Sequence, residues 1–286
     1  MKFDLHQAAS EKILVVAHRG VAGGNIPCNT ITAYETALKQ GADMIETDVS
    51  ISSDGVLVVF HPGEEPHHLG LTDRRLPQMT FEEIRTLRYQ NYDHAPTQFG
   101  IVPFDDLLET FRGRCYINVD KFWDHPEAIY RAIKRHNMLD QIVVKSDPNE
   151  TVLRMLRELA PELAFMPIVK RTHPLHEELI RSGIHYVGAE VLFDTDDDEV
   201  ASPAFLDMMH RDGKLVWVNS IIYNYKRQLS AGHSDDTALS ESMDRGWGWL
   251  ADRGFDLIQT DWPQMLIGYL KETGRYFKQK PAGRHE

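Results

Sequence analysis

The chain of 286 residues carries a formal net charge of −12, and 42% of its residues are hydrophobic. This length suits one barrel-sized domain or two smaller ones, and the composition is ordinary for a globular protein. The negative charge excludes nucleic acid as an expected partner, because binding a phosphate backbone needs basic stripes. It remains compatible with a small anionic substrate, since a few placed cations and a metal can hold one phosphate.

The two cysteines, Cys28 and Cys115, are isolated in the sequence, and no CxxC pattern occurs. Such usage gives no disulfide framework and favours a reducing compartment. The N-terminal segment lacks an apolar signal region, and no apolar run reaches the length of a membrane span. We therefore expect a cytoplasmic protein without stable membrane insertion. The default expectation for its oligomeric state is a homodimer.

Short β-branched runs alternate with helical patterns along the chain. The predicted strands are 13–17, 44–49, 56–60, 115–120, 141–146, 163–168, 185–189, 214–219 and 256–260. Helices are predicted between most of them, with examples at 30–40, 80–89, 103–111, 149–159 and 174–182. This alternation is typical of βαβ units around a parallel sheet.

Nine predicted strands exceed by one the eight of a closed barrel. The dipeptide Asp54-Gly55 joins 44–51 to 56–61 and is a strong hairpin signal, so 56–60 is predicted to be an antiparallel excursion. The remaining eight strands predict an α/β fold, a (β/α)8 TIM barrel with an extra β-hairpin after strand two. No linker divides the chain, and we expect residues 1–286 to form a single domain.

The predicted hairpin also gives a register. A two-residue loop at Asp54-Gly55 would pair Ser53 with Val56 and place Asp48 opposite His61 on one face. Glu46 lies two residues before Asp48 and shares that face. We therefore expect these two acids and this histidine to converge, an inference that a one-residue slip would remove.

An E-x-D pair on a strand offers the oxygen ligands that Mg²⁺ and Ca²⁺ prefer. Within the apolar frame M-I-E-T-D-V, uncompensated acids would be costly, so a metal or a cation must offset them. The alternatives are that this face is solvated or that Arg and Lys side chains neutralise it.

Further polar residues end other predicted strands. His18 and Arg19 follow the first strand, and Asp120 and Lys121 end the strand 115–120. In a parallel barrel these ends meet at one mouth, where active sites form. Asp120 could complete a carboxylate set and Lys121 could hold a phosphate, although a surface ion pair would explain both.

Trp217 and Asn219 lie two apart on strand 214–219 and therefore share a face. The tryptophan could line a pocket or fill the core. Lys145 is a further candidate cation at a strand end. His173 and His176 are three apart without further ligand spacing, and we expect them to be exposed rather than to bind zinc.

Taken together, several segments resemble the glycerophosphodiester phosphodiesterases. They are HRG at 18–20, Asn29-Thr30, GADMIETDVSISSDGVLVVFH at 41–61, VWVN at 216–219 and FDLIQTDWP at 255–263. The resemblance covers about residues 14 to 263. It implies a TIM barrel that hydrolyses a small phosphodiester to an alcohol and a phosphomonoester, with one divalent ion, Mg²⁺ or Ca²⁺.

Carried over by position, the resemblance makes His18 and His61 the general acid and base, and makes Glu46 and Asp48 metal ligands. Asp120 matches the third metal acid, normally a Glu in an E-x-K pattern, with Lys121 as the phosphate contact. These two residues are adjacent here, so either a bulge re-aims one of them or Asp120 alone is the match. Arg19, Trp217 and Asn219 are the remaining expected substrate contacts.

Two positions at the mouth depart from the family pattern. Cys28 replaces the Glu of P-E-N-T, and Pro62 replaces the Asp that usually follows the second histidine. Neither change removes a proposed ligand or acid/base group. Related barrels cleave sugar phosphodiesters such as agrocinopine. The alternatives to hydrolysis are a phospholipase D-like lyase that forms a cyclic phosphate, and a non-catalytic phosphodiester-binding barrel.

Overall fold

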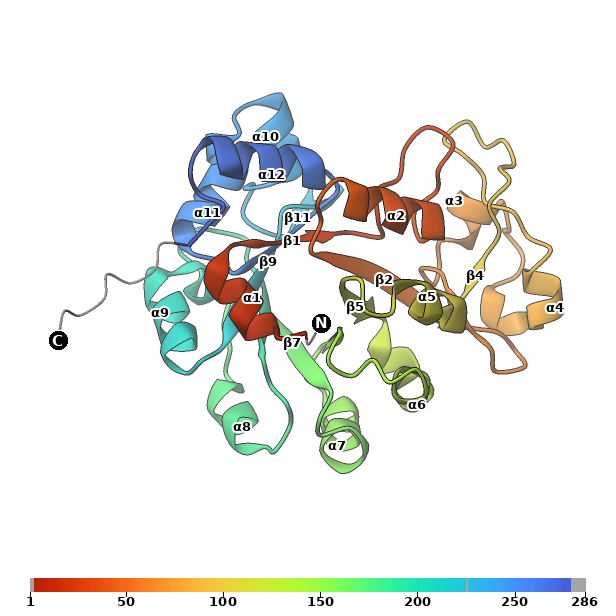
Figure 1. The fold of residues 1–286 in the computed structure, drawn as a ribbon, viewed down its shortest axis with the longest axis horizontal. Coiled ribbons are helices and arrows are strands. Elements are labelled where there is room, and N and C mark those ends of the chain that lie inside the picture. Colours follow the sequence, from red (N-terminus) through yellow and green to blue (C-terminus); the bar gives the residue numbers. More distant parts are fainter. Residues whose placement is uncertain (1–2, 225, 279–286) are drawn as a thin grey trace.

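The computed structural model describes residues 3–224 and 226–278. Eight parallel strands close into a barrel, because β1 pairs with both β2 and β12. Figure 1 shows this ring surrounded by helices. Its strands are β1 (Leu14–Ala17), β2 (Met44–Ile51), β5 (Tyr116–Asp120), β6 (Ile142–Ser146), β7 (Ala164–Lys170), β8 (Gly188–Leu192), β9 (Leu215–Asn219) and β12 (Leu257–Thr260). The TIM barrel predicted from the sequence is confirmed.

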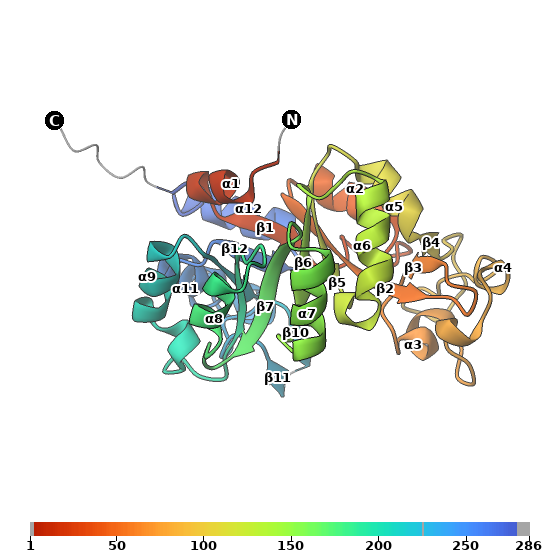
Figure 2. The same cartoon turned by 90° about the horizontal axis from the view of Figure 1, so that it is seen from below.

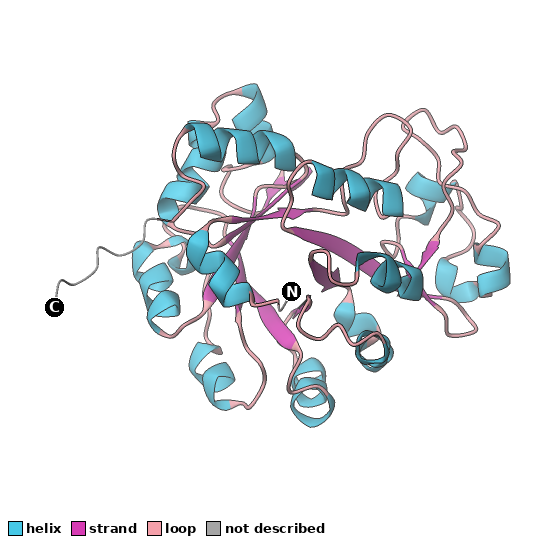
Figure 3. Cartoon of the chain, viewed as in Figure 1, coloured by secondary structure: helices cyan, strands magenta, loops and turns pink. Residues whose placement is uncertain are grey.

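Helices surround the barrel (Figure 3), and the first of them precedes β1 and packs against the amino-terminal ends of the strands. They are α1 (Leu5–Glu11), α2 (Ile31–Lys39), α3 (Glu65–Leu69), α4 (Phe81–Ile84), α5 (Phe104–Phe111), α6 (Pro126–Arg135), α7 (Glu150–Leu159), α8 (His176–Arg181), α9 (Pro203–Arg211), α10 (Asp235–Ser240), α11 (Trp249–Arg253) and α12 (Pro263–Glu272). Shorter turns are η1 (Leu76–Gln78), η2 (Phe122–Asp124), η3 (Glu199–Ala201) and the π-helical η4 (Asp244–Gly248). None of the helices in the described ranges combines the length and hydropathy needed to cross a membrane.

The extra hairpin after β2 is also present. The strands β3 (Leu57–Val59) and β4 (Val102–Pro103) extend the sheet outward from β2 and carry α3 and α4 with them (Figures 1 and 2). A separate small hairpin, β10 (Ile222–Asn224) and β11 (Arg227–Gln228), follows β9.

The predicted register of the hairpin is wrong by one residue. Val49 pairs with Val59, and the Phe60 amide donates to the Asp48 carbonyl, so Phe60 rather than His61 lies opposite Asp48. The cause is the turn, because Gly55 adopts a left-handed φ of 87° and donates to the Ser52 carbonyl. A three-residue loop with a glycine in this conformation adds one residue to the predicted two.

The strand predicted at 185–189 instead begins at Gly188. A Cβ on Gly188 would lie 2.2 Å from the Leu215 carbonyl oxygen, so this glycine lets β8 approach β9. The predicted helix 80–89 is also shorter, since α4 ends at Ile84.

The barrel interior is divided into an apolar floor and a polar upper part. Residues of α1 and the lower strands form one core cluster, which includes Leu5, Leu14, Met44, Leu257 and Trp217. Above this floor, most strands carry polar residues two or four positions further along, among them Glu46, Asp48, Asn118, Asp120, Lys145, Glu190, Asn219 and Gln259. Successive inward positions alternate along a strand, so this pattern directs the polar residues toward the mouth at the strands' carboxyl ends.

Candidate active site

Parallel pairing of β2 with β5 brings the three predicted metal acids together. Asp48 pairs with Asp120 at one level, while Glu46 lies two residues deeper on the same inner face. One carboxylate oxygen from each of the three acids lies within 4.8 Å of the others. Glu46 and Asp48 are fully buried and Asp120 is partly exposed. The convergence expected from the sequence is therefore present.

The turn after β1 supplies donors to two of these acids. Arg19 has a left-handed φ of 54°, and its backbone N–H donates to Glu46 Oε2 at 2.8 Å. Its side-chain Nε lies 2.9 Å from Asp48 Oδ2. Asn29 Nδ2 donates to the same Asp48 oxygen at 2.9 Å. The backbone turn and two side chains thus fix the orientation of the β2 carboxylates.

The backbone at Lys121 explains how two adjacent residues, Asp120 and Lys121, can both face the site. Its φ of 59° is left-handed, which turns the chain sharply after β5 and aims this side chain back at the acids. Its Nζ lies 2.9 Å from Asp120 Oδ2 and 3.9 Å from Asp48 Oδ1. The pairing of β2 with β5 is regular up to Asp120, so the left-handed backbone at Lys121, and not the expected bulge, brings both side chains to the mouth.

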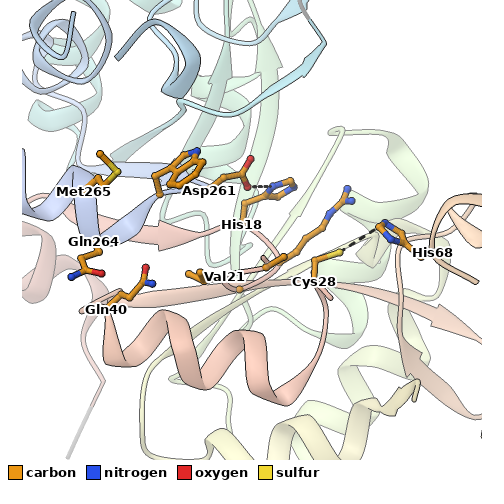
Figure 4. A pocket seen from close by; sticks show the side chains of 12 residues that line it. His18, Val21, Cys28, Gln40, His68, Asp261, Gln264 and Met265 are labelled. Carbon is orange, nitrogen blue, oxygen red and sulfur yellow. Dashed lines mark hydrogen bonds and ion pairs between the residues drawn. The ribbon is translucent and has the colours of Figure 1, made fainter. Parts of the chain in front are cut away.

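His18 lies at the end of β1 beside the last residues of β12. Its Nδ1 is 2.8 Å from Asp261 Oδ1, a contact that Figure 4 marks with a dashed line. Although burial opposes the change, the hydrogen bond to Asp261 raises the pKa of His18. An aspartate at Nδ1 fixes the ring and leaves Nε2 for a substrate.

His61 reaches the acids from the excursion. It follows β3, so its side chain is not held to the alternation of that strand, and its Nε2 lies 4.0 Å from Asp48 Oδ1. Its Nδ1 lies 4.0 Å from Glu64 Oε1. Burial lowers the pKa of His61, opposed by Asp48. The two histidines therefore stand near the acidic cluster, as expected, although the hairpin register that predicted His61 is wrong.

The acidic cluster has unsatisfied oxygens that suit a cation. Asp48 Oδ1 and Asp120 Oδ1 are buried and receive no hydrogen bond from the described residues. Burial, and next the neighbouring Asp48, raise the pKa of Glu46 to about 7. Buried carboxylate oxygens without donors are costly unless a cation compensates, and such oxygens are ligands for Mg²⁺ and Ca²⁺. The residues present therefore fit one divalent ion.

An ion-paired network lines the same central cavity as the acids. Lys145 Nζ lies 2.5 Å from Glu190 Oε2 and 4.1 Å from the centre of the Trp217 ring. Asn219 Nδ2 donates to Glu190 Oε1 at 2.6 Å. Trp217 is fully buried and belongs to the apolar floor, so it fills the core and presents no surface to the mouth. The expected substrate contact of this ring is thus not supported, while Asn219 does line the central cavity.

Two cavities meet at the candidate site. A small one of about 80 Å³ is lined by Glu46, Asp120, Lys121 and their neighbours. A larger one of about 550 Å³ shares His18 and Arg19 with it and extends past Cys28, Trp262 and Met265 (Figure 4). Cys28 Sγ lies 3.9 Å from His68 Nε2, and burial raises the pKa of this thiol to about 12. The family's carboxylate position therefore holds a neutral group here.

Sequence reasoning missed Asp261 and Glu190. Asp261 follows β12 at the same mouth as His18, and the His18 amide donates to the Thr260 carbonyl. The rule applied to His18 and Asp120, that residues after parallel strands meet, could have found it. Glu190 is missed because the predicted strand 185–189 ends one residue before it.

Two curated relatives match part of the chain in sequence. Over 179 residues, the chain is 53% identical to a glycerophosphodiester phosphodiesterase of Bacillus subtilis, covering 56% of this chain and 60% of that protein. Over 166 residues it is 31% identical to one of Caldanaerobacter subterraneus, covering 53% and 65%. The chain thus spans less than two thirds of the curated relatives it matches.

Solved structures of the same fold match nearly the whole chain. A glycerophosphoryl diester phosphodiesterase from Parabacteroides distasonis has a TM-score of 0.78 at 18% identity, covering 98% of this chain and 99% of that one. An Oleispira antarctica phosphodiesterase in complex with the product sn-glycerol-3-phosphate has a TM-score of 0.68 at 19% identity, covering 91% and 97%. The resemblance to the glycerophosphodiester phosphodiesterases is confirmed. Residues 165–270 also match the model of a domain of unknown function, DUF4996.

Proposed function

We propose that this protein hydrolyses a small phosphodiester to an alcohol and a phosphomonoester, and that residues 1–286 act as one catalytic domain. The observation that carries the proposal is the cluster of Glu46, Asp48 and Asp120, with one oxygen from each within 4.8 Å. Two cations and two histidines surround this cluster. The names of the relatives support glycerophosphodiesters as the first substrate class to test.

Glu46, Asp48 and Asp120 would hold one Mg²⁺ or Ca²⁺. When bound, such an ion polarises a phosphoryl oxygen and offsets charge that develops on it. Arg19 and Lys121 lie 2.9 Å and 3.9 Å from Asp48 and would neutralise the remaining charge of the phosphodiester. The small central cavity accordingly suits the phosphate, and the larger one beside His18 suits one of its alcohols.

The two histidines would move the protons. One ring takes a proton from the attacking hydroxyl, and the other gives a proton to the leaving alkoxide. Asp261 holds the His18 ring by its Nδ1, so that Nε2 is the atom presented to the substrate. The nucleophile is either water or a neighbouring substrate hydroxyl; in the second case a cyclic phosphate forms first and water then opens it.

Cys28 and Pro62 make the alcohol the less predictable part of the substrate. A neutral thiol replaces a carboxylate at the larger cavity, which removes one negative charge and two strong acceptors. A sugar phosphodiester therefore belongs in the test beside the glycerol compounds.

The test is turnover of a diester panel with EDTA and with Mg²⁺ or Ca²⁺ restored. The panel holds glycerophosphocholine, glycerophosphoethanolamine, a sugar phosphodiester and bis-p-nitrophenyl phosphate. Metal-restored release of a phosphomonoester is the expected result. A cyclic product that is never opened would support the lyase alternative, and ion binding without turnover of any diester would support a binding protein.

A further inference from the structure

A buried carboxylate outside the candidate site connects the elements behind His18. Asp235 begins α10 and is 3% exposed. Its Oδ1 accepts hydrogen bonds from Ser220 Oγ at 2.6 Å, Trp247 Nε1 at 2.7 Å and Thr260 Oγ1 at 2.8 Å. Its Oδ2 accepts one from the Asp261 backbone N–H at 2.9 Å. One side chain thus connects α10 with η4 and with the residues at the ends of β9 and β12.

Asp261, whose backbone N–H donates to the Asp235 carboxylate, is also the residue that contacts His18. The Asp261 side chain is 52% exposed and contacts His18 Nδ1 at 2.8 Å. It lies in the two-residue turn between β12 and α12, where the Trp262 amide also donates to Thr260 Oγ1 at 2.9 Å. An exposed carboxylate on an unsupported turn would sample several positions. Fixing its backbone restricts the oxygen that meets the ring.

We infer that Asp235 is a positioning residue that holds Asp261 in place and, through it, orients the His18 ring. This inference rests on the proposed function, in which His18 transfers a proton. Residues that hold a catalytic side chain without touching the substrate set the orientation of that side chain. Their loss typically costs about 10- to 100-fold in activity. Asp235 itself lines neither of the two cavities assigned to the substrate and does not belong to the acidic cluster.

The first test is a double-mutant cycle with Asp235→Asn and Asp261→Asn. In Asp235→Asn, the amide that replaces the carboxylate would place an N–H₂ group or a weaker acceptor against the Asp261 N–H. We expect kcat to fall about 10-fold or more in each single variant, with KM and the metal-induced rise in Tm unchanged. The double variant should be no slower than Asp261→Asn alone, because both changes act on one contact. Independent, multiplying losses would overturn the inference.

Trp247→Phe is the matched control. It removes a donor to Oδ1 of the same carboxylate and leaves the Oδ2 contact with Asp261. We expect it to lower the Tm without lowering kcat at temperatures where the protein is folded. If it lowers kcat as much as Asp235→Asn, the role of Asp235 is only structural and the inference fails. Should Asp235→Asn not fold, Asp235→Glu keeps the charge but misplaces the oxygens, and its kcat should fall in the same way.

A second readout does not depend on turnover. The proton shared by His18 Nδ1 and Asp261 should give a protected downfield NMR signal in the wild type and in Trp247→Phe, and this signal should weaken or vanish in Asp235→Asn. Its persistence in Asp235→Asn would contradict the inference even if the wild type hydrolysed no diester. A wild type with the signal but without activity would instead contradict the proposed function.

Discussion

Lys145 Nζ lies 2.5 Å from Glu190 Oε2, and both side chains are buried within the barrel, where they line the same cavity as Glu46 and Asp120. The ammonium also lies over the Trp217 ring and donates to Gln259 Oε1. Burying two charges is unfavourable unless they are paired and hydrogen-bonded, and here each has further partners. This pair therefore holds its part of the cavity wall in one arrangement.

Removing one partner should leave the other charge buried and uncompensated. We expect Lys145→Met to lower the free energy of unfolding by about 3–5 kcal/mol, measured by urea denaturation. Arg131→Met is the matched control, because its ion pair with Glu127 is exposed and should contribute at most about 0.5 kcal/mol. Equal losses in the two variants would show that Lys145 and Glu190 do not depend on each other.

The histidine assignment predicts a loss of turnover without a loss of metal. His18→Ala and His61→Ala should each lower kcat by about 100- to 10,000-fold, the usual contribution of general acid/base catalysis. The ion should still raise the Tm of both variants, because neither ring belongs to the acidic cluster. His67→Ala, at an exposed position in α3, is the control. Near-normal turnover in either variant would refute the assignment for that residue.

The acidic cluster predicts stabilisation by a divalent ion. A ligand that binds only the folded state adds about 2.7 kcal/mol when its free concentration is about 100 times Kd. Mg²⁺ or Ca²⁺ should therefore raise the Tm of the wild type in differential scanning fluorimetry, and EDTA should reverse the rise. In Glu46→Gln the rise should be lost, whereas Glu127→Gln on the surface should retain it. A full rise in Glu46→Gln would place the ion elsewhere.

A buried histidine pair on the outside of the barrel predicts a pH dependence of stability. His173 and His176, expected from the sequence to be exposed, are 5% and 3% exposed and both contact the Tyr186 hydroxyl. The expectation is wrong because these rings pack between helices around a shared hydroxyl, which residue spacing does not reveal. Burial, and next His176, lower the pKa of His173 to about 4 from 6.5.

Because the unfolded chain binds this proton at a higher pH than the folded one, stability falls as the pH drops from 6.5 to about 4. The loss from this residue amounts to roughly 3 kcal/mol across that range. Urea denaturation of the wild type and of His173→Gln at several pH values measures it, and the variant should show a shallower decline. If the free energy of unfolding of the wild type and of His173→Gln fell in parallel with pH, His173 would not cause the effect. The exposed His67→Gln is the reference variant.

Most of the barrel is predictable because its strands are separate β-branched runs and its polar strand ends are easy to find. The shared face of Glu46 and Asp48 follows from strand alternation, and the place of Asp120 follows from the rule that parallel strands end at one mouth. The register that predicts His61 near Asp48 is wrong, and His61 reaches the site because it lies beyond the end of β3. His61 does lie near Asp48, but the reason is its place beyond the strand and not the predicted hairpin register.

The failures have local causes. The left-handed φ of Gly55 sets the hairpin register, and that of Lys121 aims its side chain, yet residue type alone fixes neither angle. Trp217 and Asn219 share a face but lie at different depths, so one fills the floor and the other lines the cavity. Asp261 is within reach of the strand-end rule, whereas the contact between Asp235 and the Asp261 amide joins segments far apart in the chain, which a pass along the sequence does not reveal.

The most direct test of metal-dependent phosphodiester hydrolysis is a ³¹P NMR time course of the wild-type protein with glycerophosphocholine, glycerophosphoethanolamine and a sugar phosphodiester. With Mg²⁺ or Ca²⁺ present, at least one diester signal should decline while a phosphomonoester signal rises, and EDTA should stop both changes. Unchanged diester signals, with the ion shown to be bound by its effect on Tm, would contradict the account.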